Sequence, residues 1–93
     1  MQKNNNKKYF SFFRALANDE RLEIIKLLYK NKEMSAQDVE KKFFLEQSTT
    51  SHHLNILRRV GIAQVRKEGR HHFYSINYEV LTQFFEDFLN QFK

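Results

Sequence analysis

Four histidines have the widest chemical repertoire of the side chains in this sequence, and they occur as two adjacent pairs, His52–His53 and His71–His72. Imidazole nitrogens bind transition metals and act as general bases near neutral pH. Adjacent residues on a helix or a strand point in different directions, so neither pair is expected to chelate a metal ion. The sequence holds no cysteine, and its last helix offers only carboxylates, from Glu79, Glu86 and Asp87, which suit soft metals poorly. We therefore expect no metal and no other cofactor.

Catalysis is not predicted either. Ser51 and His52 combine a hydroxyl with an imidazole, but neighbours on a helix do not face each other. Nucleophilic catalysis needs a nucleophile within hydrogen-bond reach of an oriented base. The sequence therefore predicts a protein that is not an enzyme.

The same side chains suit the reading of DNA. A recognition helix carries short polar side chains near its N-terminus, where they reach base edges in the major groove. One short stretch has this character, although any surface helix has a polar face. We expect base contacts from Gln47, Ser48, Thr49, Ser51 and His52.

Basic residues then crowd a turn around Gly69 and a single acid, Glu68. A charged turn is usually only solvated. Directly after a polar helix, however, it is suited to lie along phosphates or in the minor groove, as the wing of a DNA-binding domain does. We expect contacts with the DNA backbone from Arg58, Arg66, Lys67, Arg70 and His71.

The elements that position these residues are predicted to be mainly helical, because the 93 residues include no proline and only two glycines. A first short helix is expected over residues 8–17. Asn18, Ser35 and Asn77 are good N-caps for three further helices, the first of which ends near residues 31–32. Another helix begins near Gln47 and ends at Gly61.

Apolar spacing predicts which helix faces are buried. The inward residues are expected to be Leu22, Ile25, Leu28 and Tyr29 in the second helix, Val39 and Phe43 in the third, and Thr50, His53, Leu54 and Leu57 in the fourth.

Two stretches alternate between apolar and polar residues, at 62–66 and 72–76, and the turn 67–70 separates them. This pattern predicts a β-hairpin with Gly69 at its turn. The order is four helices, a hairpin and a last helix. The expected fold is therefore mainly α with a small β-hairpin, a winged helix-turn-helix.

Charge is unevenly distributed along this basic chain, whose formal net charge is +5. Residues 47–77 hold five basic residues and one acidic, whereas residues 78–91 hold three acidic residues and no basic one. The middle of the chain is thus expected to face an anionic partner. No apolar run approaches the roughly 20 residues that span a bilayer, and the start lacks a signal-peptide pattern. We expect a cytoplasmic protein with a flexible basic tail, 1–7, and a single domain, 8–93.

Phenylalanines are abundant in the first and last helices, and they offer more apolar surface than one small core can bury. Exposed apolar patches mark partner sites, although the same residues could fill the core of a monomer. We expect a homodimer whose interface includes Tyr9, Phe10, Phe13, Leu81, Phe84, Phe85, Phe88 and Phe92.

Three runs carry a family resemblance. Residues 15–25 resemble the second-helix signature of the ArsR/SmtB winged-helix repressors, residues 47–58 with Gly61 and Ile62 resemble their recognition helix, and residues 66–74 resemble their wing. Within the family the chain looks closest to the cysteine-free SdpR-like autorepressors. The resemblance implies a homodimer, DNA contact through the recognition helix and wing, and relief of repression by a membrane-bound or other protein partner.

Three residues depart from the family pattern: Phe44 replaces a turn glycine or asparagine, Glu46 a hydroxyl N-cap, and Thr50 an aliphatic residue. These changes affect the expected geometry of the turn, the expected affinity for DNA and the expected packing of the recognition helix. The alternatives to a DNA-binding repressor of a palindromic operator are a protein-interaction adaptor and a metal-responsive repressor with an unconventional site.

Overall fold

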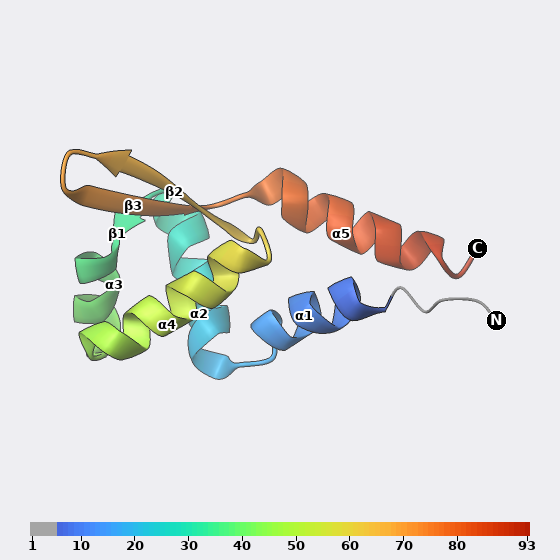
Figure 1. The fold of residues 1–93 in the computed structure, drawn as a ribbon, viewed down its shortest axis with the longest axis horizontal. Helices are drawn as coiled ribbons and strands as arrows, with labels where there is room; N and C mark the ends of the chain where they lie inside the picture. Colours follow the sequence, from blue (N-terminus) through green and yellow to red (C-terminus); the bar gives the residue numbers. More distant parts are fainter. Residues whose placement is uncertain (1–5) are drawn as a thin grey trace.

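The computed structural model describes residues 6–93 and shows five helices and three strands in that part of the chain. Of the expected tail, residues 1–5 lie outside the described part, and Lys7 already belongs to the first helix. The elements are α1 (Lys7–Leu16), α2 (Asp19–Asn31), β1 (Met34–Ser35), α3 (Ala36–Phe43), α4 (Gln47–Arg59), β2 (Ala63–Glu68), β3 (His71–Ile76) and α5 (Tyr78–Asn90) (Figure 1). The predicted winged-helix order is confirmed.

Side-chain caps begin three of the helices, as predicted. Asn18 Oδ1 accepts a hydrogen bond from the Arg21 amide at 2.9 Å, and Ser35 Oγ accepts one from the Asp38 amide at 3.1 Å. Asn77 Oδ1 accepts one from the Val80 amide at 3.2 Å. Each cap satisfies an amide that the first helical turn leaves without a partner.

The sheet differs from the predicted hairpin in two ways. Its strand order is β1-β3-β2, because the short strand β1 pairs antiparallel with β3. A two-residue strand is too short to leave an alternating pattern in the sequence. The hairpin strands are also longer than predicted, since Glu68 pairs with His71 and only Gly69 and Arg70 form the turn. Charged residues remain in these strands because the tip of the hairpin is solvated. Gly69 has φ +61°, which suits a two-residue turn with glycine first.

The buried core lies between α1, α2, α3, α4 and the start of β2. It consists of Phe12, Ala15, Ile24, Leu28, Val39, Leu54, Leu57, Ile62 and Ala63. The prediction for α2 was partly wrong, because Leu22 and Tyr29 are exposed and Arg21 and Ile24 are buried in their place. Arg21 is buried because the fold provides partners for its guanidinium, which apolar spacing alone cannot show.

Three residues at helix ends have positive φ: Lys32 at the end of α2 with φ +67°, and Phe44 and Gly61 at the ends of α3 and α4. Gly61 ends α4 with φ +86°, and a Cβ placed there would lie 3.2 Å from Val80 Cγ1, so the close approach of α5 requires glycine. Phe44 ends α3 with φ +55° in the left-handed region, which costs a residue with a Cβ about 1–2 kcal/mol. Its side chain is 95% exposed.

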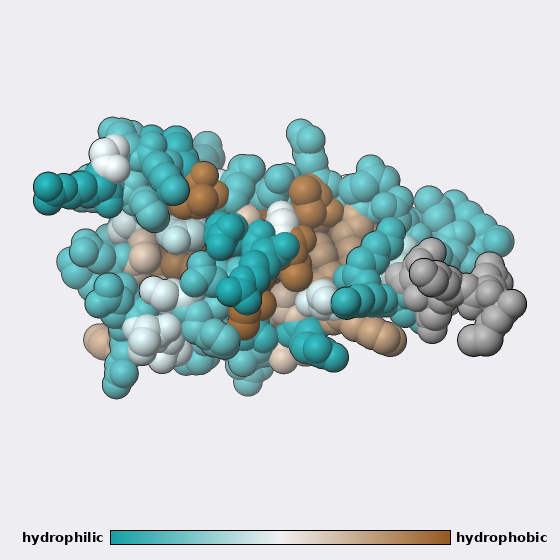
Figure 2. Space-filling model, viewed as in Figure 1, coloured by the Kyte–Doolittle hydropathy of each residue, from teal (hydrophilic) through white to brown (hydrophobic). Residues whose placement is uncertain are grey.

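The molecule is elongated, 48 × 22 × 22 Å, and its two ends differ. At one end are the hairpin turn, α3 and the start of α4; at the other, α1 and α5 lie side by side (Figure 1). Figure 2 shows hydrophilic residues over most of the same face, with apolar residues mainly between the two ends. No helix in the described part is long and apolar enough to span a membrane.

Candidate nucleic-acid interface

Helix α4 presents two different faces. Thr50, His53, Leu54 and Leu57 are buried against the domain, as predicted. The predicted base-reading residues Gln47, Ser48, Ser51 and His52 are all exposed, and Thr49 is half-buried. Because the opposite face anchors the helix, the first two turns can enter a groove without disturbing the core.

The start of α4 differs from the starts of α2, α3 and α5, which have side-chain caps. Glu46 is its N-cap residue, and its side chain forms no cap hydrogen bond. Thr50, the departure on the inner face, is fully buried, and its Oγ1 has no hydrogen-bond partner among the described residues. A buried hydroxyl without a partner costs stability, which agrees with the packing cost expected for this residue.

The hairpin tip stands beside the recognition helix. A hollow of about 250 Å³ is lined on one side by Gln47 and Ser51 of α4 and on another by Arg70 and His71 of the wing. The remaining lining residues come from α3, β1 and β3. The fold thus brings members of the two predicted groups, 19 to 24 positions apart in sequence, to one polar surface.

The predicted wing residues do not share one environment. Lys67, Arg70 and His71 are exposed on the hairpin, and Arg58 is exposed in the last turn of α4. Arg66 instead reaches across β3 toward the residue before β1. Its Nε and Nη2 donate to the two carboxylate oxygens of Glu33 at 3.0 and 2.9 Å.

Two further contacts hold the Arg66 side chain. Its Nη1 donates to Glu68, and its guanidinium lies 4.8 Å from the centre of the Phe73 ring. The hydrogen bonds from Arg66 lower the pKa of the Glu33 carboxyl below its usual value, and those to Glu33 and Glu68 raise the pKa of Arg66. Arg66 therefore ties the outer strand of the wing to the segment between α2 and β1.

A buried polar network, which the sequence pattern did not predict, joins α1, α2 and α4. Arg21 donates through Nε to the Ala15 carbonyl at 2.7 Å and through Nη2 to the Arg14 carbonyl at 3.1 Å. Its Nη1 lies 3.2 Å from His53 Nδ1. A guanidinium cannot accept a hydrogen bond, so Nδ1 of His53 is the acceptor and its Nε2 donates to Glu20 at 2.9 Å.

This network gives His53 a structural role and distinguishes it from the exposed His52. The expectation that His53 faces inward is confirmed by its 5% exposure. The sequence held one signal for this network: Arg21, three residues after the Asn18 cap, lies on the same helix face as Ile24 and Leu28. Only the fold shows that His53 is its partner.

No group of three or more histidine, aspartate or glutamate side chains in residues 6–93 is arranged to hold a metal ion. His52 and His53 have ring centres 5.9 Å apart, and both ring nitrogens of His53 are already engaged, by Arg21 and Glu20. The geometry of the described residues thus offers no arrangement for the unconventional metal site that was one of the alternatives.

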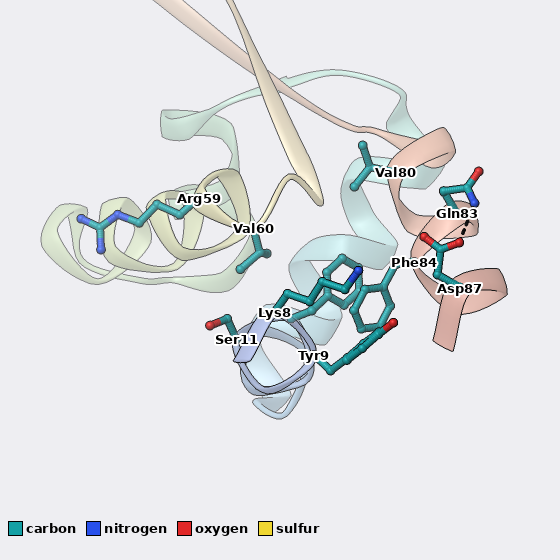
Figure 3. Close-up of a pocket in the computed structure, with 10 residues that line it drawn as sticks. Lys8, Tyr9, Ser11, Arg59, Val60, Val80, Gln83, Phe84 and Asp87 are labelled. Atoms are coloured by element: carbon teal, nitrogen blue, oxygen red, sulfur yellow. Dashed lines mark hydrogen bonds between the residues drawn. The ribbon is translucent and has the colours of Figure 1, made fainter. Parts of the chain in front are cut away.

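A second hollow, of about 470 Å³, lies between α1, the end of α4 and α5. Figure 3 shows Tyr9 and Phe84 along its base, Val60 and Val80 on either side, and Arg59 extending away from it. Lys8 Nζ lies 5.1 Å from the centre of the Tyr9 ring. This hollow is separate from the polar surface of α4 and the wing.

Aromatic rings join α1 to α5. Phe12 stacks on Phe84 with ring centres 3.5 Å apart, and Phe13 meets Phe88 at 5.0 Å. Part of the predicted dimer face is therefore already packed within one chain. The rest stays open: none of the residues of α5 is fully buried, and Phe10, Phe85, Leu89 and Phe92 are exposed.

Comparison with known proteins places this arrangement in a family. Residues 18–65, which span α2 to the start of β2, match the family described as "Bacterial regulatory protein, arsR family". The HTH-type transcriptional regulator MJ1325 of Methanocaldococcus jannaschii is 44% identical over 64 residues, 69% of this chain and 72% of that protein. The transcriptional repressor SdpR of Bacillus subtilis is 33% identical over 78 residues, 84% of this chain and 86% of SdpR.

A solved structure agrees with both relatives. Reduced HlyU from Vibrio cholerae N16961 superposes with a TM-score of 0.71 at 36% identity, over 85% of this chain and 83% of HlyU. The family match covers α2 to the start of β2, and SdpR and HlyU align with 84% and 85% of this chain. The chain belongs to the arsR family of bacterial regulatory proteins and is a DNA-binding transcriptional regulator, not an enzyme.

Proposed function

We propose that the chain is a repressor that binds an imperfect palindromic operator as a homodimer. The observation that carries this proposal is the continuous polar surface on which Gln47 and Ser51 of α4 lie across a hollow from Arg70 and His71 of the wing. On this surface α4 would enter the major groove while the wing follows the backbone.

Each predicted contact has a place in this proposal. Base edges are read by Gln47, Ser48, Thr49, Ser51 and His52. Phosphates are contacted by Arg58, Lys67, Arg70 and His71. Arg66 is proposed to hold the wing in place rather than to contact DNA, because its three guanidinium nitrogens already donate hydrogen bonds to Glu33 and Glu68.

The homodimer is supported by the open apolar surface of α1 and α5. Phe10 is 58% exposed and Phe92 73% exposed, and both line a hollow of about 400 Å³ at the end of the helix pair. A two-fold dimer through this surface would present its recognition helices to major-groove faces about 34–36 Å apart. Residues 8–93 would form this single DNA-binding and dimerisation domain.

Repression is proposed by analogy with SdpR, which is named a transcriptional repressor. The physical means would be steric, since a dimer on a promoter blocks polymerase. An in vitro transcription assay from the bound promoter tests whether the protein lowers or raises transcription. A rise in transcript on adding the protein would make the chain an activator.

DNA binding itself is tested by fluorescence anisotropy. Chelator-treated protein is titrated against its own upstream DNA and a scrambled duplex at two salt concentrations. We expect tight, salt-sensitive binding to the upstream fragment alone. Equal weak binding to both would show that the operator does not lie upstream of the protein's own gene, and no binding at low salt would favour a protein-interaction adaptor.

A further inference from the structure

Phe44 has features that folding does not explain. It ends α3 in the left-handed region at φ +55°, and the turn requires this conformation because the next amide, of Leu45, donates back to the Glu40 carbonyl at 3.0 Å. Glycine and asparagine adopt such a conformation more easily than phenylalanine. The ring is also 95% exposed, so no burial within the chain offsets the strain.

The location of Phe44 lies within the helix-turn-helix. It is three residues before Gln47, at the start of the helix proposed to read bases. In Figure 1 the turn between α3 and α4 lies at the same end of the molecule as the hairpin tip. The exposed aromatic residues of α1 and α5 lie at the other end.

The surroundings of Phe44 indicate the kind of partner. The apolar residues on either side of it, Phe43 and Leu45, are half-buried against the core, and the exposed residues near it in sequence are polar, namely Lys41, Lys42, Glu46 and Gln47. A stable protein interface buries about 800 Å² on each partner, and one ring among polar side chains supplies far less apolar surface. A single apolar side chain beside a recognition helix is, however, the right size for the C5-methyl group of a thymine.

We propose that Phe44 is a specificity-determining residue that packs on a thymine methyl next to the bases read by the start of α4. This inference rests on the proposed function, since it needs α4 to enter the major groove. It adds an apolar contact to a reading surface that is otherwise polar, and it accounts for a strained, exposed phenylalanine at a turn.

The experiment uses the full-length protein and a duplex that the wild type selects from a random pool. Thymines in one half-site are replaced one at a time by deoxyuridine, which removes only the C5-methyl group. Binding of the wild type and of Phe44→Asn is measured by anisotropy, and thermal unfolding of both is recorded. Tyr29→Asn, at another exposed aromatic residue on α2, is the matched control.

We expect Phe44→Asn to unfold at a higher temperature than the wild type, because asparagine tolerates the left-handed region. It should nevertheless bind the selected duplex more weakly. At one thymine position the loss of the methyl should weaken wild-type binding by about fourfold, the equivalent of burying one methyl group, and leave Phe44→Asn unaffected. Tyr29→Asn should bind like the wild type.

Undiminished DNA affinity of Phe44→Asn, or equal sensitivity of both proteins to every thymine replacement, would overturn the proposal. So would a change in oligomeric state with unchanged DNA affinity, which would assign the ring to a protein contact. If the wild type selects no sequence at all, it is the proposed function that fails.

Discussion

Arg66 and Arg70 are both basic residues of the hairpin, but the structure gives them different surroundings. Arg66 is bound to Glu33 and Glu68, whereas Arg70 lies exposed at the turn beside the hollow that faces α4. A guanidinium that already has two carboxylate partners has fewer donors left for a phosphate. Spacing in the sequence could not separate the two arginines.

We expect Arg70→Ala to weaken binding to all duplexes alike and to flatten the dependence of log affinity on log salt by about one unit for each bound protomer. Arg66→Ala is the matched comparison and should leave that slope unchanged. Anisotropy titrations over a series of salt concentrations measure both slopes. An unchanged slope in Arg70→Ala would remove the turn of the wing from the interface.

Ser51 lies on the exposed face of α4 and lines the hollow toward the wing. Replacing it with alanine removes a hydroxyl without disturbing the buried face. We expect Ser51→Ala to lose about 1–3 kcal/mol of discrimination between the selected duplex and a scrambled one. Competition binding measures this ratio, with Ser11→Ala on α1 as the control. Full discrimination in the variant would mean that this part of α4 does not read bases.

At the scale of elements, two polar contacts hold α4 and the wing, the parts proposed to contact DNA, to the rest of the fold. The network of Arg21, His53 and Glu20 joins α4 to α1 and α2, and the pair Arg66–Glu33 joins the wing to the segment before β1. The first is buried and the second exposed. The position of the wing is therefore expected to depend more on solution conditions than the position of α4.

The contact between Glu33 and Arg66 gives a prediction for pH. Because Arg66 lowers the pKa of Glu33 in the folded state below the ordinary value of 4.5, the contact stabilises the fold above that pH. The stabilisation is lost as pH falls through the lower folded-state value. We expect Glu33→Gln to be less stable than the wild type at neutral pH, with a difference that vanishes in acid.

Urea unfolding at a series of pH values checks this prediction. Glu86→Gln, an exposed glutamate of α5, serves as the control and should leave the pH profile as it is in the wild type. A difference between wild type and Glu33→Gln that stays constant into acid would show that the contact with Arg66 contributes nothing to stability.

At the scale of the whole molecule, the elongated shape separates the end proposed to read DNA from the aromatic end formed by α1 and α5. Helix α5 has no fully buried residue, although it carries six apolar residues from Val80 to Leu89 and a tyrosine at its start. A helix with so much apolar surface gains little from one chain alone. This is why the homodimer is proposed through α1 and α5.

Phe92 gives a clean test of that interface, because its ring is 73% exposed in one chain. A carboxylate there costs little unless a partner covers it. We expect Phe92→Asp to weaken dimerisation at least roughly thirtyfold, the equivalent of about 2 kcal/mol for a buried unpaired polar group. Sedimentation velocity at several concentrations measures the change, and Tyr29→Asp is the matched control. A dimer as stable as the wild type would place the interface elsewhere.

The amino-acid sequence alone determined the local features of this protein, namely its helix caps, helix ends and hairpin turn. Asn18, Ser35 and Asn77 cap their helices, Gly61 ends α4, Gly69 turns the hairpin, and the polar face of α4 is exposed. Each of these depends on hydrogen bonds or steric limits within a few residues, which composition and spacing reveal. The order of helices and hairpin follows from them.

The tertiary structure decided the features that join distant residues. In the folded chain β1 pairs with β3, and Arg21 rather than Leu22 lies on the buried side of α2. Arg66 donates hydrogen bonds to Glu33, and the hairpin turn lies beside α4. A sequence pattern states which residue types can be buried or paired, but the partner of a charged group lies wherever folding brings a complementary group within hydrogen-bond distance. For that reason the wing arginines, predicted as one group, have separate environments in the fold.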